Sequence, residues 1–148
     1  MTALTEPMQQ HHKHCDNLFA DAEAAAADKD WARAGMLLGA FHNDLETHFR
    51  TEEEVLFPAF ETATGMTGGP TQMMRFEHAQ MRELVGRMED ALQRQAGEAF
   101  AGDAETLLIL MQQHNMKEEN ILYPMCDRSL AAQADTLGTT LRTRLTAA

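Results

Sequence analysis

The stretch "HFRTEEEVLFPAF", His48–Phe60, sets a histidine and a glutamate inside an apolar helical stripe. The residues that share this helical face recur three or four positions apart: Leu45, His48, Glu52, Val55 and Leu56. A second stretch, "HNMKEENILYPMC" at residues 114–126, has the same form, with histidine, paired glutamates, leucine and proline at matching places. Because buried polar side chains are costly without partners, both stretches predict a site inside a helical protein.

The two stretches belong to an internal repeat with an offset of 66 residues. The same offset carries His12 onto His78, and the apolar residues around these two histidines also agree. Each half of the chain is therefore predicted to form a helix pair, with one histidine early and one His-x-x-x-Glu late. Residues equidistant from the turn of an antiparallel pair lie at one level. Six side chains can thus converge on a single layer: His12, His48, Glu52, His78, His114 and Glu118.

Helical periodicity runs through most of the chain, and no stretch alternates with the period of two typical of strands. The pattern predicts four long helices. The first covers residues 8–28, and the second runs from Trp31 to the late 50s. The third runs from Thr71 to near Gly97, and the fourth starts between Glu98 and Ala104 and ends at Pro124. We expect Asp30 to cap the second helix, Pro58 to kink or end it, and Ile121 to face inward from the fourth. Ser129 would cap a short last helix with inward leucines at 130, 137, 141 and 145. Short connections then favour an all-α, antiparallel up-down four-helix bundle with a short C-terminal fifth helix.

The composition narrows the classes of function. The 148 residues, 44% of them hydrophobic, suit a single domain over residues 1–148. A formal net charge of -11 without a basic cluster argues against nucleic acid as a partner. No apolar run approaches the roughly 18 residues of a membrane span, and the N-terminus has no signal-peptide core, so we expect a cytoplasmic protein without a membrane partner. Cys15 and Cys126 are expected to be small core residues, because two cysteines are too few for a disulfide framework.

Four imidazoles and two carboxylates in one apolar layer predict a metal centre. Without partners, each would cost on the order of several kcal/mol. Four histidines and two bridging carboxylates suit a pair of iron, manganese or zinc ions, and bundle cores often hold such dinuclear sites. The offset favours His12 as the first ligand, with His11 and His14 as competitors for that place. Glu53 and Glu119 lie one residue round from the ligand face, and we expect them to be solvated or to support the ligands from outside.

This order of residues resembles the hemerythrin-like HHE cation-binding domain over roughly Gln9 to Cys126. The resemblance implies a four-helix bundle with two Fe ions, bridged by oxo or hydroxo and by the two carboxylates. It also implies chemistry with O2, NO or peroxide. The oxygen-carrying members have a second histidine one turn after the third-helix histidine, where Arg82 stands here, and an aspartate five residues after the fourth-helix histidine. The ligand set is instead similar to that of bacterial members linked to nitrosative stress and to repair of damaged iron centres.

In such a centre each metal would hold two histidines, two carboxylate oxygens and one solvent-derived bridge, which leaves an open position on both metals. A doubly open site suits redox reaction, sensing or iron release better than reversible oxygen carriage. We therefore expect a non-haem di-iron protein with a role in sensing, or in oxidative and nitrosative stress and iron-centre repair. Two alternatives stay open: a di-iron enzyme with peroxidase-like or NO-reducing turnover, and a plain metal store. The sequence leaves the oligomeric state open.

Overall fold

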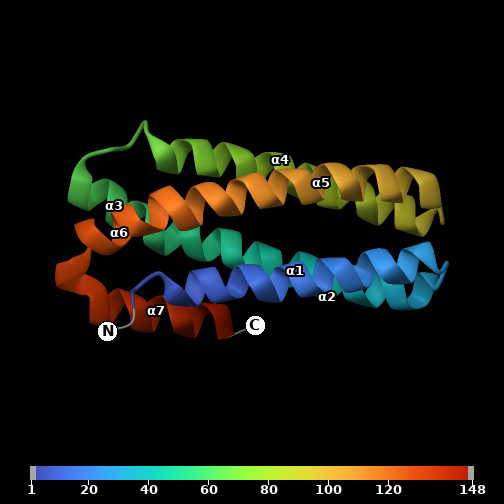
Figure 1. Ribbon diagram of the computed structural model, residues 1–148, viewed down its shortest axis with the longest axis horizontal. Coiled ribbons are helices and arrows are strands. Elements are labelled where there is room, and N and C mark those ends of the chain that lie inside the picture. The colour runs from blue at the N-terminus through green and yellow to red at the C-terminus, as the bar shows by residue number, and fades with distance from the viewer. Residues whose placement is uncertain (1–2, 147–148) are drawn as a thin grey trace.

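Four long helices form the body of the protein. The computed structural model describes residues 3–146, and the regular elements of that part of the chain are all helical. The long helices lie side by side in Figure 1: α1 (Glu6–Ala27), α2 (Trp31–Thr51), α4 (Pro70–Gln93) and α5 (Gly97–Lys117). Helix α1 packs along α2, and α4 packs along α5. The prediction of an all-helical bundle is confirmed.

Helices α2 and α5 each continue through a π-helical turn into a further helix. The turn η1 (Glu52–Leu56) leads into α3 (Phe57–Thr64), and η2 (Glu118–Leu122) leads into α6 (Tyr123–Ser129). Pro124 therefore does not close the fourth helix as expected, and Pro58 does not end the second, because each lies in the first turn of the helix that follows. In an α-helix a proline ring clashes with the carbonyl four residues earlier. The wider π turn relieves that conflict.

The π turns also rotate the buried face by one residue. α-Helical periodicity predicts that Ile121 faces inward, but Ile121 is 57% exposed and Leu122 is buried instead. Leu56 is likewise buried, whereas its neighbour Val55 is only half-buried. A π turn holds more residues than an α turn, so the residues beyond it no longer follow the α-helical count. The inward stripe predicted from an unbroken α-helix is therefore wrong at Ile121, whereas Leu56 is buried as predicted and Val55 only partly so.

The offset of 66 residues reappears in the element boundaries. Helices α2 and α5, the turns η1 and η2, and helices α3 and α6 each begin 66 residues apart. The turns between the long helices both use a left-handed residue, Lys29 with φ 59° and Gln95 with φ 51°. Asp30 caps α2 as predicted, accepting a hydrogen bond at 3.2 Å from the backbone N–H three residues on. Because the second turn needs its left-handed residue at 95, α4 ends at Gln93 and α5 already begins at Gly97, which corrects both expected boundaries.

The C-terminal segment folds back beside α1 and α2 (Figure 1). A short 3-10 helix, Ala131–Gln133, precedes α7 (Ala134–Thr146). Ser129 ends α6 and does not cap the last helix, contrary to expectation, because the chain still makes the helical hydrogen bond from Leu130 N–H to Cys126 O. Three of the predicted inward leucines are buried, and the fourth is half-buried: Leu130, Leu141, Leu145 and Leu137.

Two apolar clusters flank the level of the predicted histidines and glutamates. One fills the space between the long helices toward their connecting turns and includes Phe19, Phe41 and Leu107. The other lies under α3, α6 and α7 and includes Phe60 and Leu141. The polar layer is therefore enclosed on two sides by side chains that exclude water, which strengthens electrostatic interactions inside it.

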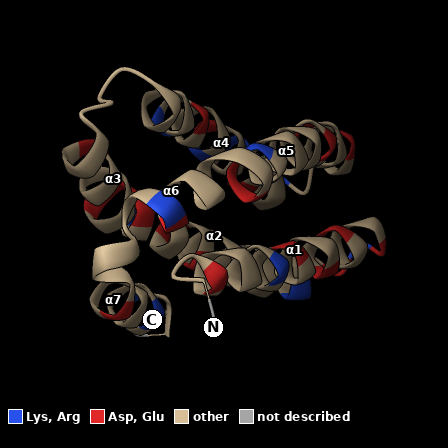
Figure 2. Cartoon of the chain, turned by 60° about the vertical axis from the view of Figure 1, so that its left-hand side comes forward, with Lys and Arg blue, Asp and Glu red and all other residues tan. Residues whose placement is uncertain are grey.

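The charged side chains are mixed over the surface. In the view of Figure 2, lysines and arginines stand among aspartates and glutamates along the long helices. Among residues 3–146, no helix is both long enough and apolar enough to cross a membrane. The single domain and the cytoplasmic location stay predictions.

Candidate metal centre

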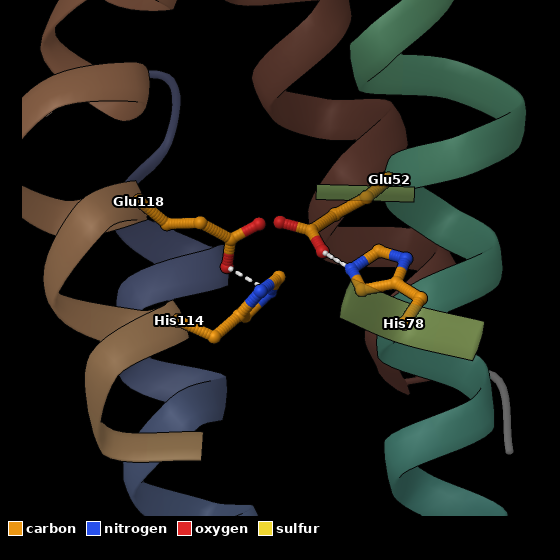
Figure 3. A group of neighbouring side chains, drawn as sticks. All are labelled: Glu52, His78, His114 and Glu118. Carbon is orange, nitrogen blue, oxygen red and sulfur yellow. Dashed lines mark ion pairs between the residues drawn. The ribbon is translucent and has the colours of Figure 1, made fainter. Parts of the chain in front are cut away.

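Glu52 and Glu118 occupy the first positions of the two π turns and reach toward each other across the bundle (Figure 3). All six predicted residues are buried, from 0% exposure for these two glutamates to 5% for His12. Their ligand atoms form two groups, and within each group all atoms lie within 4.8 Å of one another. The first group is Glu52, His78, His114 and Glu118, and the second is His12, His48 and Glu118. The structure thus brings together the residues that the repeat placed at one level.

The first group contains atoms without hydrogen-bond partners. His78 Nε2 lies 3.1 Å from Glu52 Oε1, and His114 Nε2 lies 3.3 Å from Glu118 Oε1. Among residues 3–146, the buried side-chain nitrogen and oxygen atoms that lack a hydrogen bond are Glu52 Oε1, His78 Nε2, His114 Nε2 and Glu118 Oε2. Leaving such an atom unpaired costs about 1–3 kcal/mol. Imidazole nitrogens and carboxylate oxygens that converge in this way fit a divalent first-row metal ion.

The second group surrounds a tyrosine hydroxyl that the sequence reasoning missed. Tyr123 Oη donates to Glu52 Oε2 at 2.7 Å and lies 3.1 Å from Glu118 Oε1. It also lies 3.3 Å from His12 Nε2 and 3.5 Å from His48 Nε2. Its ring stacks on His12 with centroids 5.6 Å apart. The hydroxyl therefore stands among the possible ligand atoms of the second group.

The π turn explains why Tyr123 was missed. It follows Glu118 by five residues, and in an α-helix with 3.6 residues per turn that spacing points the two side chains in different directions. In the π turn, the backbone N–H of Tyr123 bonds to the carbonyl of Glu118, so both side chains face the cluster. The available signal was Pro124, which disfavours a regular α-turn just before it.

Each of the four histidines is oriented through its outer nitrogen. The Nδ1 contacts are His12 to Glu119 at 2.6 Å, His48 to His11 at 2.9 Å, His78 to Glu53 at 2.7 Å, and His114 to Glu77 at 2.8 Å. When Nδ1–H donates outward, the lone pair on Nε2 points to the centre. Outer acceptors of this kind fix the tautomer and raise the basicity of a metal-binding imidazole.

Two of these outer acceptors are anchored by cations. Arg82 bonds to Glu53 at 2.9 Å and to Glu46 at 2.9 Å, so it pairs with carboxylates rather than extending freely outward. Burial raises the pKa of Glu53, but hydrogen bonds from His78 and Arg82 outweigh it and lower that pKa to about 2. Lys117 forms an ion pair with Glu77, the acceptor of His114. Both carboxylates are thereby kept ionised, which makes them stronger hydrogen-bond acceptors.

The two inner carboxylates, those of Glu52 and Glu118, are buried next to each other. Burial and the neighbouring Glu118 raise the pKa of Glu52 to about 7. Burial also raises the pKa of Glu118, but the charge of His114 outweighs it and holds that pKa well below its usual range. Burial lowers the pKa of His114, and Glu118 and Glu77 together raise it to about 10. Two buried carboxylates that disfavour each other's charge would be relieved by bound metal cations.

The three neighbouring histidines of α1 have different surroundings. His12 turns Nε2 to Glu118 at 3.0 Å, inside the layer. His11 meets the layer from outside, at the outer nitrogen and ring of His48. His14 is largely exposed and pairs with Asp44 at 2.6 Å. This geometry favours His12 over its two competitors, and its role as a ligand stays a prediction.

A comparison with known families and proteins bears on this geometry. The family model of the hemerythrin HHE cation binding domain matches residues 3–126. The chain belongs to this family. Membership of a cation-binding family agrees with the buried cluster of histidines and glutamates that the structure shows.

The HHE domain is also similar to curated bacterial proteins. It is 27% identical over 138 residues to the iron-sulfur cluster repair protein YtfE of Salmonella schwarzengrund (strain CVM19633). The YtfE proteins of Salmonella paratyphi B (strain ATCC BAA-1250 / SPB7) and Salmonella newport (strain SL254) show the same identity. Each alignment covers 84% of this chain but only 61% of the relative. No solved structure matches the chain.

Proposed function

We propose that this HHE domain holds two iron ions between the long helices of an antiparallel four-helix bundle. His12 and His48 would bind one ion, and His78 and His114 the other. Glu52 and Glu118 would bridge the two. The observation that carries the proposal is the pair of interlocking ligand groups that share Glu118, with four buried donor atoms left unpartnered. Bundle cores with facing Glu and His residues suit dinuclear iron sites.

The side chains of the domain have separate tasks in this proposal. Iron would supply the redox change and the open positions for a small molecule such as O2, NO or peroxide. The outer acceptors keep the Nδ1 protons outward, so that the Nε2 lone pairs face the centre. The apolar clusters above and below the layer exclude water. The Tyr123 hydroxyl, held 2.7 Å from Glu52 Oε2, provides a hydrogen-bond donor inside the layer.

The proposed cellular role is a response to oxidative or nitrosative stress, including repair of damaged iron centres. It is supported by similarity to proteins named for iron-sulfur cluster repair. The chain spans 61% of the length of those relatives, so their activity is carried over here only as a proposal. The buried layer of histidines and carboxylates supports it further, because iron held by such ligands can react with oxidants and NO.

Metal content tests the first part of the proposal. Protein purified without chelator and loaded with ferrous iron in air should contain two irons per chain and show near-ultraviolet charge-transfer absorption. The variant His78→Ala/His114→Ala should lose at least one iron. His42→Ala is the matched control, since His42 is half-exposed and pairs with Glu89 at 2.8 Å, away from the layer. One iron in the wild type, or zinc alone without iron uptake, would contradict the proposal.

Repair activity tests the second part. An iron-sulfur enzyme inactivated by NO should recover when incubated with the iron-loaded domain and a sulfide source. It should not recover with the metal-free domain or with Glu52→Gln/Glu118→Gln. Equal recovery with free ferrous iron at the same concentration would remove the reason to assign repair to the protein.

A multi-turnover enzyme is the second candidate, and the buried hydroxyl of Tyr123 favours it because a phenol inside the layer can donate a hydrogen bond to a reacting small molecule. Many moles of peroxide or NO consumed per mole of protein, with a reductant present, would select the enzyme. Modification of the protein once, without turnover, would select the sensing and repair role.

A further inference from the structure

The two halves of the centre are related by the 66-residue offset, yet their outer acceptors differ. The contact of His12 with Glu119 corresponds to the contact of His78 with Glu53. In the remaining pair of contacts the chemistry changes. His114 donates to a carboxylate, that of Glu77, whereas His48 meets the imidazole of His11. The repeat therefore places a histidine where its other copy has a glutamate.

The half that contains His78 and His114 is called here the second position, because it comes second in the chain; it includes the first of the two ligand groups described above. Ionised side chains hold the outer nitrogens of both of its histidines. Both imidazoles are backed by carboxylates, and each of those carboxylates is paired with a cation. Arg82 holds Glu53 and Lys117 holds Glu77. Charge-assisted hydrogen bonds of this kind are stronger than neutral ones and fix the acceptor in place. The two histidines of the second position are therefore strong, rigidly oriented donors.

The half that contains His12 and His48, called here the first position, has weaker support. Its one carboxylate acceptor, Glu119, has a side chain that is 30% exposed. Within residues 3–146, Glu119 forms no ion pair with a lysine or arginine, and its ion-pair contact is His12. The acceptor for His48 is the imidazole of His11, whose ring stacks on that of His48 with centroids 5.1 Å apart. A neutral nitrogen polarises the His48 N–H bond less than a carboxylate does.

A cavity also reaches the first position. A cavity of about 520 Å³ is lined by His12 and Glu119 together with exposed residues of α1, among them Gln9, Gln10 and Lys13. A small chelator or an acceptor protein's side chain can approach His12 from this side. The outer carboxylate that orients His12 lies in the wall of the same cavity, so a ligand there can compete for that hydrogen bond.

We propose that the two metal positions are unequal, and that metal leaves and enters at the first position. The inference rests on the proposed dinuclear centre and deepens it, because a protein that supplies iron needs one ion that exchanges. Weaker orientation of His48 and access to His12 both act on the same ion. Loss of an outer partner typically weakens metal binding ~10–100-fold, so the replacement of a carboxylate by an imidazole is large enough to separate the two positions.

Release of iron to a chromogenic ferrous chelator under anaerobic, reducing conditions tests the proposal. The wild-type domain loaded with two irons should release them in two phases of about one iron each. His11→Glu restores the carboxylate of the other copy and should slow the fast phase ~10-fold. Glu77→His makes the reciprocal change at the second position and should accelerate the slow phase ~10-fold. His14→Ala, which alters an exposed neighbour of His11, should leave both phases unchanged.

The outcomes are distinguishable from failure of the proposed function. A wild-type protein that holds two irons and releases both in one phase would overturn the inequality and leave the dinuclear centre standing. A wild-type protein that never holds two irons would instead overturn the centre itself. Two phases that respond to neither substitution, in variants with wild-type helical content, would overturn the assignment of the fast phase to the first position. If His11→Glu fails to fold, the wild-type phases and Glu77→His still decide the question.

Discussion

Metal removal should destabilise this HHE domain by an amount that the structure sets. Four side-chain atoms in the layer are buried and have no hydrogen-bond partner among residues 3–146. At about 1–3 kcal/mol for each unpaired buried group, the lower end of the range gives ~4 kcal/mol for the set. For a chain of this size, 1 kcal/mol corresponds to a melting-temperature change of roughly 2–4 °C. Complete chelation should therefore lower the melting temperature by at least about 8 °C.

Thermal unfolding followed by circular dichroism, with and without complete metal removal, measures this difference. The matched control is Glu52→Gln/Glu118→Gln, which keeps the shape of both bridging side chains but removes their charge. Chelation should leave the melting temperature of this variant nearly unchanged. The reasoning is refuted if the wild-type melting temperature stays the same after all metal has been removed. It is equally refuted if the double variant shows as large a drop as the wild type.

Three further predictions follow from individual side chains. His12→Ala should reduce the iron content from two to about one per chain, whereas His14→Ala should keep two. Elemental analysis of identically prepared variants measures this. If His14→Ala loses iron and His12→Ala keeps it, the assignment of His12 as the first ligand is wrong. Glu53→Gln should weaken metal binding ~10–100-fold, because His78 loses its ionised acceptor. A competition titration against a chelator measures the affinity, and an unchanged affinity would contradict this prediction. Leu141→Ala should cost about 2–5 kcal/mol of unfolding free energy in urea denaturation, since Leu141 is fully buried; a change under about 1 kcal/mol would mean that α7 adds little to the core.

The helices and the six candidate ligands were readable in the amino-acid order. Helical periodicity is a local property, and the apolar stripes of α1, α2, α4 and α5 extend over many turns. The spacing of His48 and Glu52 places them on one face whatever the rest of the chain does. The repeat then supplied long-range information that a single motif lacks, because two helix pairs of equal length must put His12 and His78 at corresponding heights.

Helix ends were less predictable than helix interiors. Pro124 is a local breaker by its own chemistry, yet the π turn before it lets the helix continue to Ser129. The same turn brings Leu122 inward in place of Ile121. Whether a proline ends a helix or follows a π turn depends on the packing of the residues beyond it, which the local pattern does not contain.

The outer support of the centre belongs to the tertiary structure. Glu119 and His12 are 107 residues apart in the chain, and Glu77 and His114 are 37 apart. A surface carboxylate on one helix becomes the acceptor for a histidine on another only when the helices pack at a particular rotation. Tyr123 enters the layer because a backbone turn of unusual width points it there. Side-chain identity and spacing can nominate the groups that would bind a metal. The contacts that orient those groups, and make the two halves of the centre unequal, arise only when distant helices come together.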